Sequence, residues 1–168
     1  MRIGYGFDSH EFRPGIPLKI GGIVLAHDKG LGGHSDGDVL LHAITDALLG
    51  AVAAPDIGVL FPPSDPKWKG ADSVVFLREA LNRVRDAGYG VANMDASLIL
   101  AAPKIGPHAA TIRMRVAQLL GVHADCVGLK AKTPEGLDLE NAAIAHVVVL
   151  LEKLATPKKP EKKNKNKT

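Results

Sequence analysis

The stretch from Gly32 to Gly50, GGHSDGDVLLHAITDALLG, constrains the fold most, because a glycine-rich loop leads there into one amphipathic helix. Ser35 or Asp36 is the predicted N-cap, since short polar side chains accept hydrogen bonds from the unpaired amides of a first helical turn. Gly50 is a suitable end for the helix. Apolar residues recur between these limits with the helical period, at Val39, Leu40, Ile44, Ala47 and Leu48.

His42 lies in the middle of this predicted helix, with Asp38 one turn before it and Asp46 one turn after it. Residues four apart share a helix face, so both carboxylates are expected beside the imidazole. An acid in that place can hold a metal-binding histidine in one tautomer. The alternative interpretation is a salt-bridged surface histidine that binds no ligand.

A partner for His42 is expected at the start of the chain, where Ile3 to His10 reads as a strand. Asp8 and His10 are two residues apart and therefore point to the same face. Together with His42 they form a three-ligand set for a divalent metal, which leaves one position open for water or substrate. The same set describes zinc and non-haem iron sites, so ligand type does not choose between them. A D-x-H pair on a strand is also common as plain surface chemistry.

These motifs resemble the 2-C-methyl-D-erythritol 2,4-cyclodiphosphate synthase family of the non-mevalonate isoprenoid pathway, from Met1 to about Glu152. The specific signal is the GxDxH opening together with HSDGD and a histidine four residues later. The residues that carry the resemblance are Phe7-Asp8-Ser9-His10, His34-Ser35-Asp36-Gly37-Asp38, His42, Asp56-Ile57-Gly58, Phe61-Pro62 and Ala102-Pro103-Lys104.

The resemblance implies an enzyme, a phosphorus-oxygen lyase that acts on 4-diphosphocytidyl-2-C-methyl-D-erythritol 2-phosphate. The 2-phosphate would attack the β-phosphorus within the same molecule, so that CMP leaves and a cyclic diphosphate remains. The family is a homotrimer with active sites between subunits, and its partner is a small cytidine diphosphate substrate. Two rival functions remain open at this point: a metal-dependent phosphohydrolase and a non-catalytic metal-binding trimer.

The resemblance also assigns roles to residues. Zinc is the expected ion at Asp8, His10 and His42, and Glu135 resembles the ligand of a magnesium or manganese ion that accompanies the diphosphate. His34 and Thr133 take the catalytic positions, as donors to the phosphates. The substrate-binding positions fall on Asp8, His10, His34, Ser35, Asp56, Ile57, Gly58, Phe61, Asp65, Ala102, Pro103, Lys104, Lys132, Thr133 and Glu135.

Local patterns alone support weaker interpretations of some of these positions. Asp56 is equally suited to be a turn cap, and Lys104 reads as an ordinary surface lysine. Three features depart from the family pattern: two single positions, and the segment Asp138-Leu139-Glu140-Asn141, which is shorter than the usual glycine-rich segment with an arginine. Pro63 stands where an acid is usual, which puts one contact to the erythritol hydroxyls in doubt, and Lys132 stands where a threonine is common.

The remaining elements predict an α+β fold, a mostly antiparallel sheet covered on one face by helices. The final segment, Ala142 to Leu154, fits helix or strand by pattern, but the run Val147-Val148-Val149 favours a strand. Val75 is expected among the inner residues of the second helix. The other predicted elements are a hairpin over 18–25, the second helix over 72–87, a strand over 91–101, a third helix over 107–120 and a strand over 127–132.

Length and charge bound the remaining possibilities. The 168 residues suffice for one domain, expected over 1–156, and the lysine-rich tail 157–168 has no apolar residue to order it, so we expect disorder there. The tail carries six lysines and one glutamate of a chain with net charge +3, which leaves an acidic body and argues against a nucleic-acid partner. No apolar run is long enough for a membrane span. A single cysteine, Cys126, and no visible signal peptide favour the cytoplasm, with Cys126 expected to be buried.

Overall fold

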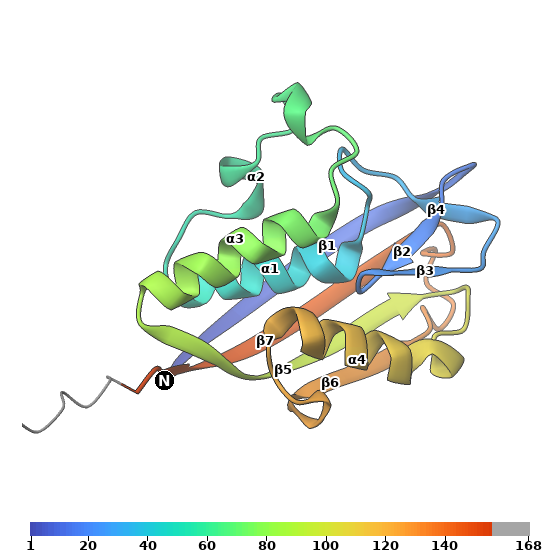
Figure 1. Ribbon diagram of the computed structural model, residues 1–168. Helices are drawn as coiled ribbons and strands as arrows, with labels where there is room; N and C mark the ends of the chain where they lie inside the picture. Colours follow the sequence, from blue (N-terminus) through green and yellow to red (C-terminus); the bar gives the residue numbers. More distant parts are fainter. Residues whose placement is uncertain (156–168) are drawn as a thin grey trace, which may run out of the picture.

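The computed structural model describes residues 1–155, in which a five-stranded sheet carries three long helices on one face (Figure 1). The strand order is β4-β1-β7-β5-β6, and a separate two-stranded ribbon pairs β2 with β3. The strands are β1 Arg2–Pro14, β2 Leu18–Ile20, β3 Ile23–Leu25, β4 Lys29–Leu31, β5 Tyr89–Leu100, β6 Val127–Lys132 and β7 Ala142–Lys153. The helices are α1 Val39–Ala51, α2 Ile57–Leu60, α3 Ser73–Asp86 and α4 Ala109–Leu120, with short 3-10 turns at Pro66–Trp68, Gly106–His108 and Ala124–Cys126.

The sheet has the predicted, mostly antiparallel character. β1 pairs antiparallel with β4 and β7, and β5 pairs antiparallel with β7. β5 and β6 are parallel, with Met94 opposite Val127, because α4 carries the chain back across the helical face between them. The final segment is a strand, as its β-branched residues indicated. The α+β prediction is confirmed.

Helix α1 lies directly on β1, and two glycines make this close approach possible. A Cβ atom on Gly4 would lie 1.8 Å from the carbonyl oxygen of Ala47, and one on Gly6 would lie 1.9 Å from that of Ala43. The backbone of α1 therefore occupies the space that the side chain of a larger residue at position 4 or 6 would need. The approach brings His42 of α1 next to the polar end of β1.

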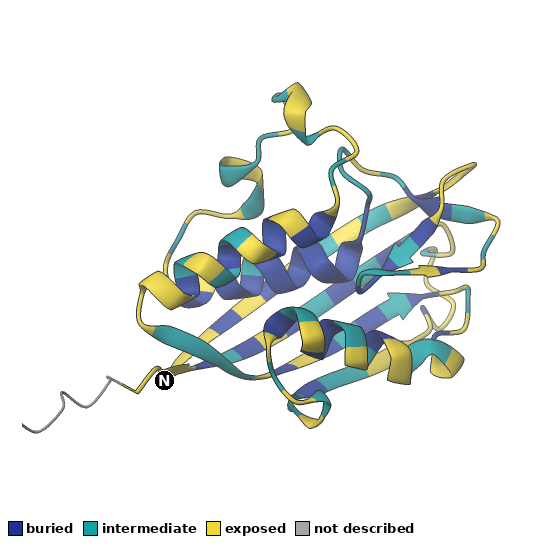
Figure 2. Cartoon of the chain, viewed as in Figure 1, coloured by how far each residue is buried: buried dark blue, intermediate teal, exposed yellow. Residues whose placement is uncertain are grey.

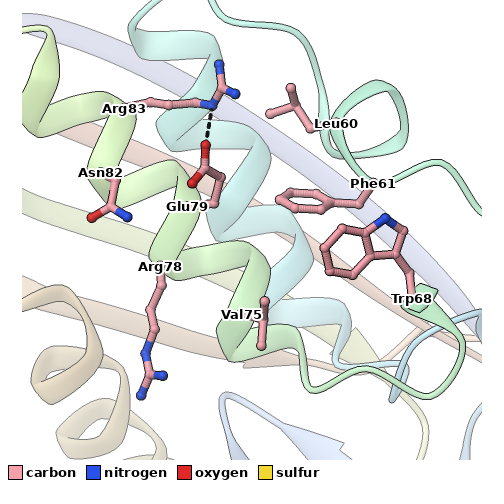
Figure 3. Close-up of a pocket in the computed structure, with 8 residues that line it drawn as sticks. All are labelled: Leu60, Phe61, Trp68, Val75, Arg78, Glu79, Asn82 and Arg83. Atoms are coloured by element: carbon pink, nitrogen blue, oxygen red, sulfur yellow. Dashed lines mark hydrogen bonds and ion pairs between the residues drawn. The ribbon is translucent and has the colours of Figure 1, made fainter. Parts of the chain in front are cut away.

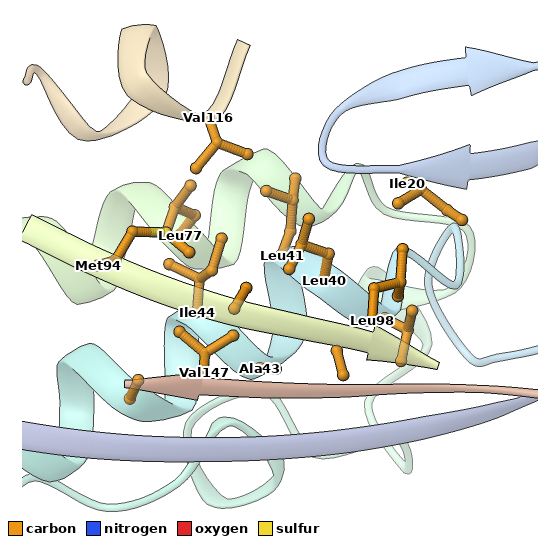
Figure 4. Packing of buried hydrophobic residues seen from close by; sticks show 14 of the residues in the cluster. Ile20, Leu40, Leu41, Ala43, Ile44, Leu77, Met94, Leu98, Val116 and Val147 are labelled. Atoms are coloured by element: carbon orange, nitrogen blue, oxygen red, sulfur yellow. The ribbon is translucent and has the colours of Figure 1, made fainter. Parts of the chain in front are cut away.

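The core lies between the helices and this face of the sheet, and α1 is its centre (Figure 2). Figure 4 shows Ile44 of α1, Leu77 of α3 and Met94 of β5 among the side chains that meet there. Each buried leucine or isoleucine of this kind contributes about 1.5–3 kcal/mol. The predicted inner face of α3 was wrong at Val75, which is 43% exposed, while Phe76 is buried.

The start of α1 differs from the prediction. Asp38 is the N-cap, not Ser35 or Asp36, and its carboxylate accepts a hydrogen bond from the backbone N–H of Leu41. The same carboxylate accepts hydrogen bonds from the backbone N–H groups of Gly21 and Gly22 in the β2–β3 turn, at 2.9 and 2.7 Å. The cap is thus fixed by a contact with a distant turn, and the helix ends at Ala51, one residue beyond Gly50.

Three other expectations concern chain composition. None of the helices within residues 1–155 is long and apolar enough to cross a membrane. Cys126 is only partly buried, which corrects the expected buried position. The expected disordered tail, 157–168, lies outside the described residues.

Candidate functional site

Three side chains form a compact cluster where β1 and α1 meet. Asp8 Oδ2 lies 2.8 Å from His10 Nε2 and 2.9 Å from His42 Nδ1, and the two histidine nitrogens are 3.0 Å apart. The predicted set Asp8, His10 and His42 is therefore brought together by the fold, with one ligand atom from each residue within 4.8 Å of the others. Asp8 and His10 share a face of β1 because strand side chains alternate, as the sequence indicated.

The charges in the cluster depend on one another. Burial raises the pKa of Asp8, but the hydrogen bonds and charges of His10 and His42 outweigh it and lower that pKa to about 2. Burial lowers the pKa of His10, yet its bond to Asp8, the charge of Asp8 and the Gly32 carbonyl raise it above its ordinary value. A negative carboxylate beside two imidazoles is the charge pattern that a bound cation would complete.

The cluster fits a divalent metal ion by its donor atoms. His10 Nδ1 donates a hydrogen bond of 2.6 Å to the carbonyl oxygen of Gly32, which can only accept, so the Nε2 lone pair faces Asp8 and His42. One carboxylate and two neutral imidazoles suit zinc and non-haem iron alike. With only three protein ligands, a bound ion would keep a position for water or substrate.

The acids predicted beside His42 have other partners. Asp38 is fully buried and caps α1, and Asp46 accepts a hydrogen bond of 2.8 Å from the backbone N–H of Ile57. The second ring nitrogen of His42 instead faces two hydroxyls, Ser73 Oγ at 2.8 Å and Ser35 Oγ at 3.0 Å. Spacing along one helix placed the acids correctly on a shared face but did not reveal the contact with Ser73 of α3.

A cavity opens beside the cluster and contains several of the predicted substrate positions. His10 and His42 line this cavity, which we call the metal-cluster cavity, and its other lining residues come from the 34–35 loop, from the segment 57–68 and from α3. The predicted residues that line it are His34, Ser35, Ile57, Gly58 and Phe61, and Pro63 lies in the same wall.

Asp56 and Asp65 do not line this cavity; each caps a short helix that contributes a residue to its wall. Asp56 caps α2 by accepting a hydrogen bond from the N–H of Val59, and Asp65 caps the 3-10 turn at Pro66–Trp68 and pairs with Lys67 at 2.9 Å. Asp56 thus takes the turn-cap role that local patterns allowed.

Two aromatic side chains that sequence reasoning did not single out, Trp68 and Phe76, form a continuous wall with the predicted Phe61. The ring centroids of Phe61 and Phe76 are 4.6 Å apart, and those of Phe61 and Trp68 are 5.0 Å apart. Figure 3 shows Phe61 and Trp68 side by side, where they also border a second hollow of about 330 Å³ along α3. The indole nitrogen of Trp68 and Nε2 of His34 are buried without a hydrogen-bond partner among residues 1–155. His34 therefore has an unsatisfied polar atom in the wall of the metal-cluster cavity.

The other predicted substrate positions gather around a separate cavity between the end of β5, the loop before α4 and the end of β6. This cavity of about 330 Å³ is lined by Pro103, Lys104, Lys132 and Thr133 among others, and the Ala102–Pro103 peptide bond is cis. Glu135 follows in an exposed turn with φ of 51° and accepts a hydrogen bond from Thr133 Oγ1. No lining residue is shared with the metal-cluster cavity. One chain thus carries the predicted residues in two separate groups.

Comparisons with known proteins agree with the motifs. The family model described as YgbB family matches residues 1–152. A curated protein of Koribacter versatilis, named 2-C-methyl-D-erythritol 2,4-cyclodiphosphate synthase, is 69% identical over 153 residues, which cover 91% of this chain and 99% of that protein. A chloroplastic protein of the same name from Arabidopsis thaliana is 57% identical, with 91% of this chain and 68% of that protein covered.

A solved structure adds agreement in three dimensions. The CDP-bound form of a 2C-methyl-D-erythritol-2,4-cyclodiphosphate synthase is similar with a TM-score of 0.85 and 44% sequence identity, and the match covers 90% of this chain and all of that one.

Proposed function

Because the chain belongs to the YgbB family and is a 2-C-methyl-D-erythritol 2,4-cyclodiphosphate synthase, we propose that Asp8, His10 and His42 form its metal centre. The enzyme converts 4-diphosphocytidyl-2-C-methyl-D-erythritol 2-phosphate into 2-C-methyl-D-erythritol 2,4-cyclodiphosphate and CMP. The observation that carries the proposed centre is the convergence of three ligand atoms beside a cavity, with His10 Nε2 left free by the bond of its other nitrogen to Gly32.

The geometry supports a role for the protein in neutralising and orienting phosphates. When bound, a divalent cation at the cluster supplies Lewis-acid polarisation of a phosphate oxygen. His34, whose Nε2 lacks a hydrogen-bond partner, and Ser35 both line this cavity, and their side chains would hydrogen-bond phosphate oxygens there. A phosphate nucleophile is already ionised, so the reaction needs in-line positioning and charge stabilisation rather than a general base.

Zinc is the proposed ion at this centre, and Glu135 is the proposed ligand of a magnesium or manganese ion bound with the diphosphate. Carboxylate oxygen suits those harder cations. Glu135 lies in an exposed turn, and its carboxylate accepts a hydrogen bond from Thr133 Oγ1. Because both side chains are exposed, a ligand outside the chain can reach them.

We further propose that the two cavities combine across subunits of a homotrimer. The metal-cluster cavity would hold the reacting phosphates and the erythritol part, with Asp56 and Asp65 as caps of the short helices in its wall. The cavity lined by Pro103, Lys104, Lys132 and Thr133, with Ala102 next to it along the chain, would hold the cytidine end from a neighbouring subunit. The separation of the two groups within one chain supports this arrangement.

The outer face of the sheet supports the same assembly. Ile3, Tyr5, Phe7 and Val148 are exposed there on β1 and β7, by 72, 58, 47 and 46%, and form an apolar surface opposite the helices. Apolar side chains clustered on one face of a sheet are typical of an interface between subunits. A cytoplasmic location stays a prediction from the sequence.

Product analysis by phosphorus NMR tests the activity directly. We expect a cyclic diphosphate and free CMP from the purified protein and the cytidyl substrate. Inorganic phosphate would instead indicate the rival phosphohydrolase, and metal binding without turnover would indicate the non-catalytic alternative. Elemental analysis of the same preparation identifies the ion.

A further inference from the structure

Ser73 occupies a position between the proposed metal ligand His42 and a buried ion pair. Its side chain is fully buried at the start of α3, and its Oγ lies 2.8 Å from Nε2 of His42. The same hydroxyl donates a hydrogen bond to Oδ1 of Asp36. Oδ2 of Asp36 in turn accepts a hydrogen bond of 3.0 Å from Nζ of Lys19. These contacts form one chain of hydrogen bonds, from Lys19 through Asp36 and Ser73 to His42.

The direction of each bond in this chain follows from the number of hydrogens available. A serine hydroxyl has one hydrogen, and an ionised carboxylate only accepts. The pairing with Lys19 keeps Asp36 a carboxylate, because the side chain of Asp36 is only 10% exposed and the ammonium lies against it. The Ser73 hydrogen is therefore committed to Asp36, so Ser73 Oγ faces His42 as an acceptor.

We infer that Asp36 and Ser73 are positioning residues that place a hydrogen on Nε2 of His42 and thereby present its Nδ1 lone pair to the metal. This inference rests on the proposed metal centre and extends it beyond the three ligands. Without the chain, the Asp8 carboxylate 2.9 Å from Nδ1 would favour a hydrogen on that nitrogen. Ser35, whose Oγ is 3.0 Å from Nε2, would then be free to donate to it. Both changes oppose binding of a cation at Nδ1.

Asp36→Asn gives the sharpest test, because it reverses the chain without changing its size. The amide oxygen would face the Lys19 ammonium, and the amide N–H group would face Ser73, with loss of the long 3.4 Å hydrogen bond that Oδ1 accepts from the backbone N–H of Asp38. Ser73 would accept that hydrogen bond and turn its own hydrogen toward Nε2 of His42. A purely structural role for Asp36 does not predict this reversal.

The experiment measures zinc affinity by competition with a chromophoric chelator, in wild type, Asp36→Asn and Ser73→Ala. Loss of a residue that orients a metal-binding histidine typically weakens binding about 10- to 100-fold, and we expect both variants in that range. Ser35→Ala is the matched control, since it removes a hydroxyl from the same nitrogen but leaves the chain intact, and its zinc affinity should remain within about threefold of wild type.

A second measurement reads the hydrogen itself. In zinc-stripped protein labelled with ¹⁵N-histidine, long-range nitrogen–proton correlation should show Nε2 of His42 protonated in wild type and unprotonated in Asp36→Asn. The inference is overturned if wild-type Nε2 carries no hydrogen, or if Asp36→Asn keeps wild-type zinc affinity. If Ser73→Ala does not fold, Asp36→Asn decides the matter alone. His42→Ala separates the two proposals: unchanged zinc affinity in that variant would reject the metal centre, whereas its loss with intact affinity in Asp36→Asn would reject only the positioning role.

Discussion

Asp8 supplies the negative charge in the cluster of Asp8, His10 and His42. Its carboxylate contacts both histidines, and this lowers its pKa from 3.8 to about 2 although burial acts in the opposite direction. A depressed folded-state pKa means that the native state binds the proton less well than the unfolded chain. The contribution to stability is therefore fully present above the unfolded pKa and is lost as the pH falls through about 2.

We expect this linkage to be visible in zinc-stripped protein. Between pH 4 and pH 2 the wild type should lose up to about 2 kcal/mol more stability than Asp8→Asn, since one pKa unit corresponds to about 1.4 kcal/mol. The raised pKa of His10 has the opposite pH dependence. Its contribution to the free energy of unfolding is present below pH 6.5 and declines as the pH rises through the folded-state pKa. Urea unfolding at a series of pH values measures both arms. Parallel curves for wild type and Asp8→Asn would contradict the expected charge pairing.

His42→Ala should abolish metal binding and turnover while the fold is retained. Each of the three ligands supplies one of the few donor atoms, and turnover needs the polarising charge. Elemental analysis and CMP release measure the two losses, and circular dichroism checks the fold. Asp46→Asn is a suitable control: its carboxylate lies on the same helix but accepts a bond from the Ile57 amide, so zinc content should persist. Near-normal metal content in His42→Ala would remove the assignment.

At the scale of elements, patterns within one segment were predictable and contacts between segments were not. The β2–β3 hairpin, the final strand and the pairing of Asp8 with His10 on one face follow from local periodicity. The predicted start of α1 was wrong because the actual N-cap, Asp38, is held by hydrogen bonds from Gly21 and Gly22 in a distant turn. The partner of His42 Nε2 was missed for the same reason, since Ser73 belongs to another helix.

The contact of α1 with β1 gives a prediction about glycine. Gly6→Ala should destabilise the protein by several kcal/mol or prevent folding, because the new Cβ would lie 1.9 Å from the carbonyl oxygen of Ala43 and neither backbone can move freely. Gly50→Ala is the matched control within α1, where the nearest atom to the new Cβ is 3.8 Å away. It should raise stability by about 0.5–1 kcal/mol through helix propensity. Thermal unfolding of both variants measures this, and equal melting temperatures would refute the close-packing argument.

At the scale of the whole molecule, the sequence resemblance predicts a trimer, and the structure of one chain places the predicted site residues in two separate cavities, as a site shared between subunits would require. The metal-cluster cavity and the cavity beside Thr133 share no lining residue, and each is open to its surroundings. The local patterns did not reveal this division, because His42 and Thr133 are far apart in the sequence and no periodicity relates their positions in space. Only the fold separates them.

A mixture of two inactive variants tests whether one active site is built from two subunits. His42→Ala removes the metal half of the site, and Thr133→Ala removes a residue of the other half. If these halves meet across subunits, trimers that contain both variants regain about one third of the wild-type activity, since one of their three sites joins an intact half to an intact half. Co-expression with two affinity tags followed by sequential purification yields the mixed trimers, and release of CMP measures activity. Each variant purified alone serves as the baseline. If both halves belonged to one subunit, no mixture would exceed that baseline, because every chain would carry a defective site.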